Sequence, residues 1–435
     1  MSYNFISSNK VKSSVYKNNK YLYKVCFPLV LSLFAFSVNA ELFKEKRAET
    51  FKEAFDKGTT ELDFRLRYED VGKGNQGAQA LTLRSRLSFE TLPYELFTAY
   101  VEFDDVRAIP NDNNYYSGAN DQFDDLFIED PEGTELNQAW LAYDIINTFI
   151  KFGRQSINLN NQRLLGGDSW RQNEQTFSAL SIQNEMLNYT RIQFAQLNQV
   201  QTNQDKTIGS AHQDINAKLF NLNYRGFWLS DLSFYALWIS DHQDDRLWET
   251  STYGINFKGK LGGDFSIDYE LDFAQQEDAG ANPSSYSVSY ALVDLLFAYQ
   301  GLELKTGYER LGASNGGYFV APLGSLYNFQ GASGQFSING LGNIETGIQD
   351  SYLGLGYQTE VTLCQKKLPF SVSASYHDFD VDTEVNNISH LGEEWVIKAD
   401  LEVDNYQMLI QFSEYHADHY AQDDRHLWLS FAMSF

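Results

Sequence analysis

The amino-acid sequence predicts an all-β protein, specifically a transmembrane antiparallel up-and-down β-barrel of about eighteen strands that follows a cleaved signal peptide. Three observations lead to this prediction. Apolar and polar residues alternate through most of the chain, tight turns alternate with long polar loops, and the last strand ends in an aromatic residue. A barrel in a membrane has this pattern because one face of each strand meets lipid and the other meets water. Aromatic residues make up 15% of the 435 residues, which favours strands over helices.

Residues 1–40 have the pattern of a signal peptide. A lysine-rich stretch without acids precedes an apolar stretch at residues 25–38, and Val38 and Ala40 provide the small residues of a cleavage site. An uncleaved anchor is the alternative, but the apolar stretch is shorter than the about 20 residues of a spanning helix. Cleavage after Ala40 removes five lysines and no acid, so the formal net charge changes from −25 to −30.

The remaining chain is strongly acidic and retains only Cys364, so no internal disulfide bond can form. No other run of 18 apolar residues exists, which excludes helical membrane spans. An acidic exported chain is not expected to bind nucleic acid. Much of the acid lies in predicted loops, where it suits contact with divalent cations and the outer-leaflet surface. The sequence contains no glycine-rich phosphate loop and no cysteine-based metal motif, so we predict no cofactor.

Residues 41–58 are expected to form a short periplasmic segment, helical up to Lys57 and ended by Gly58. The barrel itself is expected at residues 59–435. Its first strand, at residues 60–69, alternates strictly between an apolar face and a charged face. Residues 81–91 repeat this pattern with Arg84 and Arg86 on the polar face.

We predict eighteen strands, with sixteen as the alternative count. They are expected at residues 59–69, 78–92, 95–107, 135–145, 148–158, 175–184, 188–198, 213–225, 230–241, 246–259, 263–276, 285–299, 302–311, 347–363, 369–380, 393–403, 405–416 and 425–435. An even number places both termini on the periplasmic side.

Two long predicted loops differ from the others in composition. Residues 108–133 are rich in Asp and Glu, and residues 312–347 are rich in Gly, Asn, Ser and aromatic residues. A loop of about 35 residues is uncommon unless it is functional or disordered. Each loop is expected either to fold into the barrel mouth as a constriction or to remain a solvated outer loop.

The chain ends in a strand whose apolar face includes the terminal Phe435. This ending resembles the recognition signal of bacterial outer-membrane proteins. We therefore expect the cell outer membrane as the location, outer-membrane lipid as the surroundings, and the barrel assembly machinery as a partner.

Residues 137–177 carry the motifs NQAWLAY, FGRQ at 152–155, NQRLLGG at 161–167 and WRQNEQTF at 170–177. This region resembles the signature of the alginate export family of outer-membrane proteins, which are porin-like. The resemblance implies a monomeric barrel of eighteen strands. It also implies passage of an anionic polyuronate, such as alginate, through a lumen lined by arginine.

Eight arginines are candidates for pore-lining selectivity residues. They occur on predicted strands one, two, five and seven and in the loop after strand five: Arg65, Arg67, Arg84, Arg86, Arg154, Arg163, Arg171 and Arg191. Facing inward, they would attract a carboxylate polymer. Alternatively, each arginine pairs with a lumen acid such as Glu61, Asp63, Glu69, Glu90, Glu102 or Asp104. The second half of the chain has many acids on its polar faces, so a general or substrate-preferring porin for hydrophilic solutes is the alternative to an alginate channel.

Two further classes of function remain as alternatives. An outer-membrane enzyme would use His377 with Asp378, or Glu414 with His416 and His419, and the His416, Asp418 and His419 group could hold a metal. Histidines on acidic loops are common without either role, so we predict no catalytic residue and no metal ligand. A structural barrel without an open channel is the third class, but a charged interior in a barrel of this size favours an aqueous channel.

Overall fold

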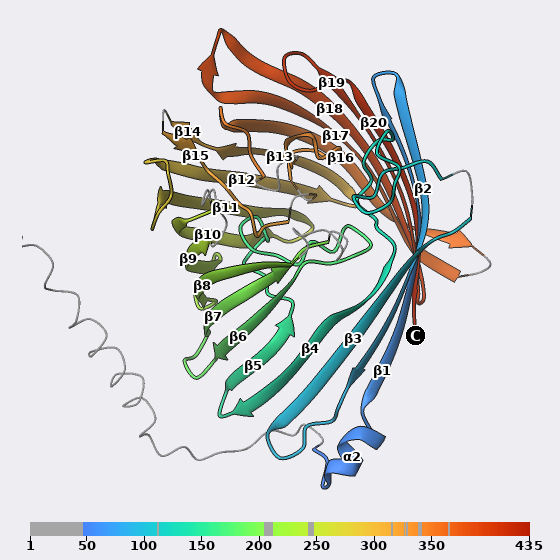
Figure 1. Ribbon diagram of the computed structural model, residues 1–435, viewed down its shortest axis with the longest axis vertical. Helices are drawn as coiled ribbons and strands as arrows, with labels where there is room; N and C mark the ends of the chain where they lie inside the picture. The colour runs from blue at the N-terminus through green and yellow to red at the C-terminus, as the bar shows by residue number, and fades with distance from the viewer. Residues whose placement is uncertain are drawn as a thin grey trace, which may run out of the picture. The chain divides into compact units, whose positions relative to one another are not determined.

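The computed structural model describes residues 47–110, 113–203, 212–241, 248–314, 316–325, 327, 329–337, 342–363 and 366–435. The predicted signal peptide and residues 41–46 lie outside these ranges. Eighteen strands form one sheet in which each strand pairs antiparallel with the next, and β20 pairs with β1 to close the ring. Figure 1 shows this ring of strands around an interior that is crossed by loops. The predicted fold class and the count of eighteen are confirmed.

The strands are long and mostly match the predicted positions within a few residues. Their bounds are β1 (Thr59–Lys73), β2 (Gln76–Glu90), β3 (Phe97–Ala108), β4 (Gly133–Ile145), β5 (Thr148–Gln155), β6 (Thr176–Asn184), β7 (Thr190–Gln201), β8 (His212–Tyr224), β9 (Asp231–Asp241), β10 (Thr250–Gly262), β11 (Phe265–Asp278), β12 (Ser287–Tyr299), β13 (Leu302–Leu311), β16 (Ile348–Leu363), β17 (Lys366–Val385), β18 (Ile388–Val403), β19 (Tyr406–Ala417) and β20 (Asp424–Ser434). Two short strands, β14 (Ala313–Ser314) and β15 (Gly317–Tyr318), and the 3-10 turn η1 (Gln335–Ser337) lie between β13 and β16.

The seam between the first and last strands includes the terminal residue. The backbone N–H of Phe435 donates to the carbonyl oxygen of Leu62 at 2.9 Å, and the N–H of Leu62 donates back at 3.1 Å. Closure matters because every backbone polar group at membrane depth must be paired within the protein.

Apolar side chains cover the outer face. On β1 to β3 the outward positions include Leu66, Leu87 and Phe103, all exposed, while the charged residues between them face the lumen. The alternation predicted from the sequence therefore separates a lipid-facing surface from a polar interior.

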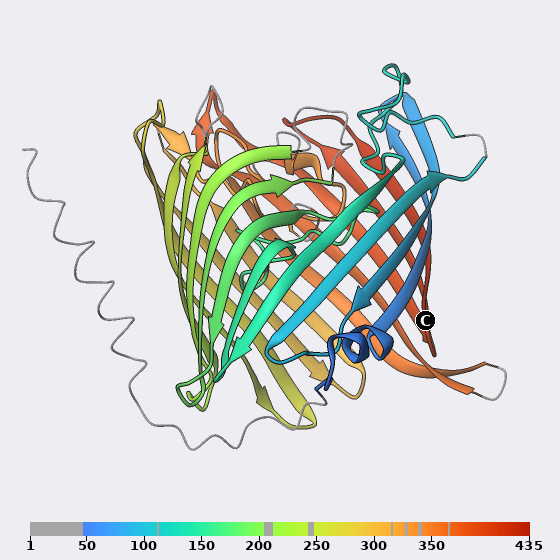
Figure 2. The same ribbon diagram turned by 60° about the horizontal axis from the view of Figure 1, so that its bottom comes forward.

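The long loops lie at one end of the barrel, together with the two-residue turns at 74–75 and 386–387, and the opposite end carries short connections. We call the latter the tight-turn end, and Figure 2 shows the short helix α2 (Phe51–Asp56) there. The helix is shorter than predicted because the Thr50 side chain accepts a hydrogen bond from the Glu53 N–H and so begins it only at Phe51. The sequence also suggested a long connection between residues 380 and 393. Instead, β17 and β18 continue to a two-residue turn, because Asn386 and Asn387 adopt the left-handed backbone that such hairpins require.

Two loops fill much of the lumen. We call residues 156–175 inner loop A and residues 312–347 inner loop B. Leu165 of loop A and Leu323 of loop B form a parallel β-bridge, and both are fully buried. These loops pack on apolar inward residues of β6 to β9 such as Phe177, Leu197 and Leu219. Figure 1 shows loop A, in green, inside the ring.

The acidic loop between β3 and β4 behaves differently. Its Tyr115 and Ile128 pack on Val71, Ala78 and Ala80 of the β1–β2 hairpin, so most of it covers one side of the barrel end. The end of this loop also reaches the lumen, where the Tyr327 hydroxyl donates to Glu129 at 2.8 Å and the Gln172 N–H donates to Asp130 at 3.1 Å. Both long loops singled out in the sequence therefore enter the interior, and residues 312–347 supply side chains to its apolar core.

No helix in the described part of the chain is long and apolar enough to cross a membrane.

Candidate functional site

Four of the predicted arginines form one side of the lumen. Arg65 and Arg67 on β1 and Arg84 and Arg86 on β2 point inward from neighbouring strands, and we call this group the arginine wall. Arg67 and Arg84 are buried, and the other two are partly buried.

Acids neutralise most of the arginine wall. Both oxygens of Asp104 accept hydrogen bonds from Arg86, at 2.7 and 2.6 Å, and Glu174 of inner loop A accepts a third at 2.9 Å. Arg84 pairs with Asp63 at 2.5 Å. Paired and desolvated guanidinium groups of this kind hold structure together and present little free charge to a passing ion.

Arg65 fixes inner loop A through polar contacts. Its Nε donates to the side-chain oxygen of Gln172 at 2.8 Å, and its Nη1 donates to the carbonyl oxygen of Ser169 at 3.0 Å. Gln172 is fully buried and also donates to Thr82 Oγ1 at 2.9 Å. The arginine wall therefore carries the loop on its surface.

Three arginines also stack on aromatic rings of the inner loops. Arg67 lies 4.5 Å from the ring centroid of Trp170, Arg171 lies 4.3 Å from that of Tyr327, and Arg163 lies 4.9 Å from that of Phe329. Desolvated stacks of this type each contribute on the order of 2 kcal/mol. They join the two inner loops to each other and to the barrel.

Arg171 and Arg163, both from inner loop A, complete this link with buried ion pairs. Arg171 contacts Glu69 of β1 at 2.8 Å, and Arg163 contacts Glu309 of β13 at 2.9 Å. Burial opposes the charge of Arg171, but Glu69, Tyr327 and Asp130 outweigh it and hold the pKa of this guanidinium well above its ordinary value. Buried ion pairs therefore hold loop A to two separate strands of the barrel, β1 and β13.

The two remaining predicted arginines lie apart from this group. Arg154 shares a face of β5 with the exposed Phe152, so strand alternation places it on the outer face, and its Nη1 donates to the carbonyl oxygen of Leu136 at 2.7 Å. This corrects the expectation that Arg154 lines the lumen. Arg191 lies at the tight-turn end of β7 and pairs with Glu185 at 2.5 Å, with both side chains partly exposed.

Open space lies against a different part of the interior. A cavity of about 550 Å³ borders the inner faces of β11 to β13 and β16 to β18, which we call the cavity wall. A second cavity of about 660 Å³ continues from it towards the tight-turn end, and the two share Glu270, Asp294, Leu296 and Lys305. Together they form a path along one side of the lumen.

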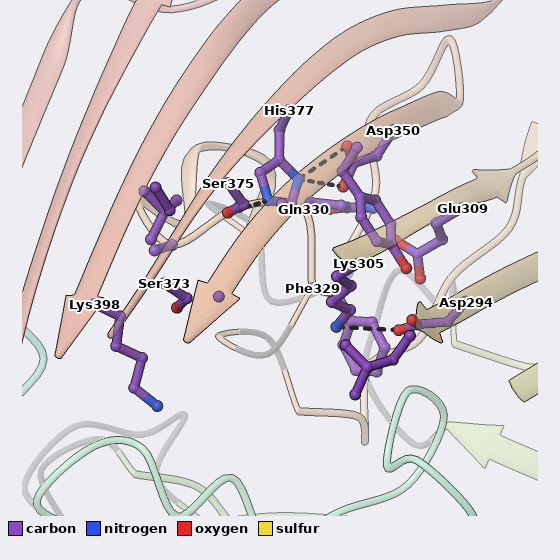
Figure 3. A pocket seen from close by; sticks show the side chains of 18 of the residues that line it. Asp294, Lys305, Glu309, Phe329, Gln330, Asp350, Ser373, Ser375, His377 and Lys398 are labelled. Carbon is purple, nitrogen blue, oxygen red and sulfur yellow. Dashed lines mark hydrogen bonds and ion pairs between the residues drawn. The ribbon is translucent and has the colours of Figure 1, made fainter. Parts of the chain in front are cut away.

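The cavity wall carries both signs of charge, with an excess of acid. Figure 3 shows Lys305 beside Asp294, at 3.1 Å, and His377 beside Asp350, at 3.0 Å. Lys398 extends into the same space. Glu303 also lines it and forms no ion pair with any described residue.

Sequence reasoning did not identify the inner-loop residues at this site. Gln330 lines the cavity, although nothing in its local sequence distinguishes it from other polar loop residues. The sequence did predict that the acids in the second half of the chain lie on the polar, inward faces of their strands. Whether these acids face open space depends on where the inner loops lie.

The histidines considered for catalysis or metal binding have other surroundings. His377 lies in the lumen beside Asp350 and Ser375, whereas Asp378 instead contacts His390 at 3.1 Å. The pairing of His377 with Asp378 that an outer-membrane enzyme would have used is therefore not formed. Among the described residues, no group of three or more His, Cys, Asp or Glu side chains is arranged to hold a metal ion.

Comparison with protein families gives a match to the alginate export model over residues 57–287, more than half of the chain. The chain belongs to the alginate export family. No curated protein matches it significantly.

Several solved structures share the fold of this family member. They include OpdK of Pseudomonas aeruginosa, crystallised with vanillate, at 14% identity over 88% of this chain and 99% of OpdK, with a TM-score of 0.65. OccD3 (OpdP) of the same organism has 13% identity over 88% of this chain and 92% of its own, with a TM-score of 0.63. OpdO has 13% identity over 88% and 98%, with a TM-score of 0.65.

Family and fold together establish the general role. The protein is an outer-membrane β-barrel channel for hydrophilic solutes. Its family and its structural neighbours are channels and not enzymes.

Proposed function

We propose that this member of the alginate export family is a substrate-preferring diffusion channel for small hydrophilic solutes. The observation that carries the proposal is the pair of adjoining cavities along the cavity wall, since the inner loops occupy the lumen elsewhere. Solutes would pass one at a time between the acidic side chains of this wall and the aromatic side chains of the loops.

The charge arrangement supports a preference for cations over anions. The arginine wall is paired with Asp63, Asp104 and Glu174, while Glu303 faces the cavity without a counter-ion among the described residues. A free carboxylate beside a narrow path raises the local concentration of cations and repels anions. In this proposal the arginines serve mainly to anchor the inner loops.

Export of a polyuronate is the rival function, and family membership supports it. An extended anionic polymer would need inner loop B to leave the lumen and would then meet the acids of the cavity wall. The vanillate bound in the OpdK crystal is a small aromatic carboxylate, and it supports a small-solute path in this fold.

We also propose that the Ser375, His377 and Asp350 arrangement does not act as a hydrolase. Ser375 Oγ lies 3.3 Å from His377 Nε2, as in a nucleophile and base pair. However, Ser375 lies within β17 and pairs with Gly354 on one side and Val396 on the other, so its neighbouring backbone N–H groups serve the sheet. Because these donors are not available to stabilise an oxyanion, a serine-reactive fluorophosphonate is expected to leave the refolded protein unlabelled. Labelling at Ser375 would contradict this part of the proposal.

Single-channel conductance and reversal potential under a salt gradient test the main proposal. The refolded chain is expected to carry current with cation preference, and Glu303→Gln is expected to weaken that preference. Arg154→Gln serves as the matched control because its side chain lies on the outer face. A closed channel or a clear anion preference in the wild-type chain would overturn the proposal.

A further inference from the structure

Three side chains that line the cavity beside β11 to β13 and β16 to β18 carry buried hydrogen-bond donors that have no partner among the described residues. Nε2 of Gln330, Nδ2 of Asn161 and Nε1 of Trp170 are inaccessible to solvent and donate to no described group. Gln330 is 96% buried, since only 4% of its surface is exposed. Buried donors are almost always paired in native proteins, so three orphan donors around one cavity call for oxygen atoms from outside the chain.

The same cavity also presents unpaired acceptors. Oε2 of Glu309 is buried without a hydrogen-bond donor, although Oε1 of this carboxylate contacts Arg163. The carboxylate of Glu303 and the hydroxyl of Ser373 line the cavity and make no hydrogen bond to any described residue. A ligand that fits must therefore both accept and donate hydrogen bonds, as a hydroxyl group does.

The aromatic lining and the charges of the cavity further restrict the chemical class of ligand that it would bind. Phe329 and Tyr352 add aromatic surface to the lining, and Figure 3 shows Phe329 close to Lys305. The cationic groups at the site are already engaged, since Lys305 contacts Asp294 at 3.1 Å and Lys398 contacts Asp400 at 3.3 Å. With Glu303 as the unpaired charge, the site disfavours an anion.

We infer that this cavity is a binding station for a neutral polyhydroxylated solute of the size of a mono- or disaccharide. Hydroxyl groups would satisfy the orphan donors and acceptors, and the non-polar face of a sugar ring would lie against the aromatic side chains. The volume of about 550 Å³ is within the usual range for small-molecule sites. This inference rests on the proposed function, because a solute reaches the station only through an open channel.

A size-matched pair of probes tests the inference in the refolded chain. Glucose and glucuronate differ in charge at one carbon, so the comparison isolates the effect of the carboxylate. Glucose, added at increasing concentration, is expected to interrupt the single-channel current, with a half-blocking concentration well below that of glucuronate. Equal or stronger block by glucuronate, or no block by glucose, would overturn the inference.

Two variants connect the block to the named residues. Gln330→Leu keeps the volume and removes the amide, so the half-blocking concentration of glucose should rise about five- to tenfold, as expected for the loss of one hydrogen bond. The control is Gln275→Leu, because Gln275 lies exposed on β11 and bonds to Ser287. Glu303→Gln removes the unpaired negative charge and should therefore lower the half-blocking concentration of glucuronate relative to that of glucose. Identical glucose block in wild type and Gln330→Leu would overturn the assignment.

Failure of the inference differs visibly from failure of the proposed function. An absence of current without any sugar would reject the channel proposal itself. Current that glucose does not modulate would reject only the binding station.

Discussion

The arginine wall and the cavity wall are both charged faces of one lumen, but the two adjoining cavities lie along the cavity wall. Arg84 and Arg86 contact acids and inner loop A on the first wall. On the second wall, Asp294 and Lys305 line both adjoining cavities and Glu303 lines the first. Charged side chains thus anchor a loop in one half of the barrel and border open space in the other.

The difference between the walls comes from what covers them. Inner loop A brings Glu174 and Gln172 to the arginine wall, where the loop replaces the water that would otherwise solvate the guanidinium groups. The cavity wall faces open space that the inner loops border with a few residues, Asn161 and Trp170 of loop A and the segment around Phe329 and Gln330 of loop B. Charge on a strand therefore indicates which face is inward, whereas loop placement decides which charge an ion meets.

Removing the loop that separates the walls should have the largest effect. Replacement of residues 319–342 by a short Gly-Ser linker is expected to raise single-channel conductance several-fold, because it empties the lumen between β6 and β13. Replacement of residues 119–125 in the loop between β3 and β4 is the control and should leave conductance nearly unchanged. Equal conductance in the two variants would contradict the assignment of inner loop B as the obstruction.

Breaking a buried ion pair should have the next largest effect, on stability. Arg163→Met leaves Glu309 buried without a counter-ion and is expected to cost about 3–5 kcal/mol. Urea unfolding of the refolded barrel measures this loss. Combining Arg163→Met with Glu309→Gln should restore much of it, and a double variant as unstable as the single one would refute the pairing argument.

Acid pH should loosen inner loop A from the arginine wall. Burial of Glu174 disfavours its charge, but Arg86, Arg84 and Arg65 outweigh burial and lower the pKa of this loop carboxyl below its ordinary value. Its contribution to stability is therefore present above the ordinary pKa of about 4.3 and is lost as the pH falls through the lower, folded-state pKa.

The measurement for Glu174 is the thermal unfolding temperature at a series of values from about pH 7 to about pH 3. The wild-type temperature should fall more steeply in acid than that of Glu174→Gln, which has already lost the interaction. Parallel curves for the two proteins would show that Glu174 has no part in the acid sensitivity.

The smallest effect is expected for a comparable pair on the cavity wall. Lys305→Met removes the partner of Asp294, but both side chains are substantially solvated, so the loss of stability should be about 0–1 kcal/mol. The same urea titration as for Arg163→Met provides the comparison. If Lys305→Met lowered the free energy of unfolding as much as Arg163→Met does, the proposed difference between the solvated cavity wall and the ion pairs covered by inner loop A would be wrong.

The strands were predictable because lipid and water impose a period of two on every one of them. Leu66 and Arg67 are adjacent on β1, so their side chains point to opposite faces of the sheet. Their polarity assigns the lipid face and the lumen face without any information on the strands that pair with β1. The hairpin at Asn386 and Asn387 was missed because the apolar signal weakens where β17 and β18 extend beyond the predicted ends. Arg154 was placed on the wrong face because the expectation grouped it with the other arginines, whereas alternation with Phe152 places it outside.

By itself, the sequence determined the barrel, its eighteen strands and most of the charges that face the lumen, since these depend on alternation and connection length within short segments. Only the tertiary structure decided that Arg163 reaches Glu309, that Arg171 reaches Glu69, and that Gln330 faces a cavity. These contacts join residues more than one hundred positions apart, or depend on the path of a loop without regular structure. The physical reason is that ion pairing and burial depend on which residues lie close together in the closed barrel. The periodicity of the sequence gives no information on that proximity.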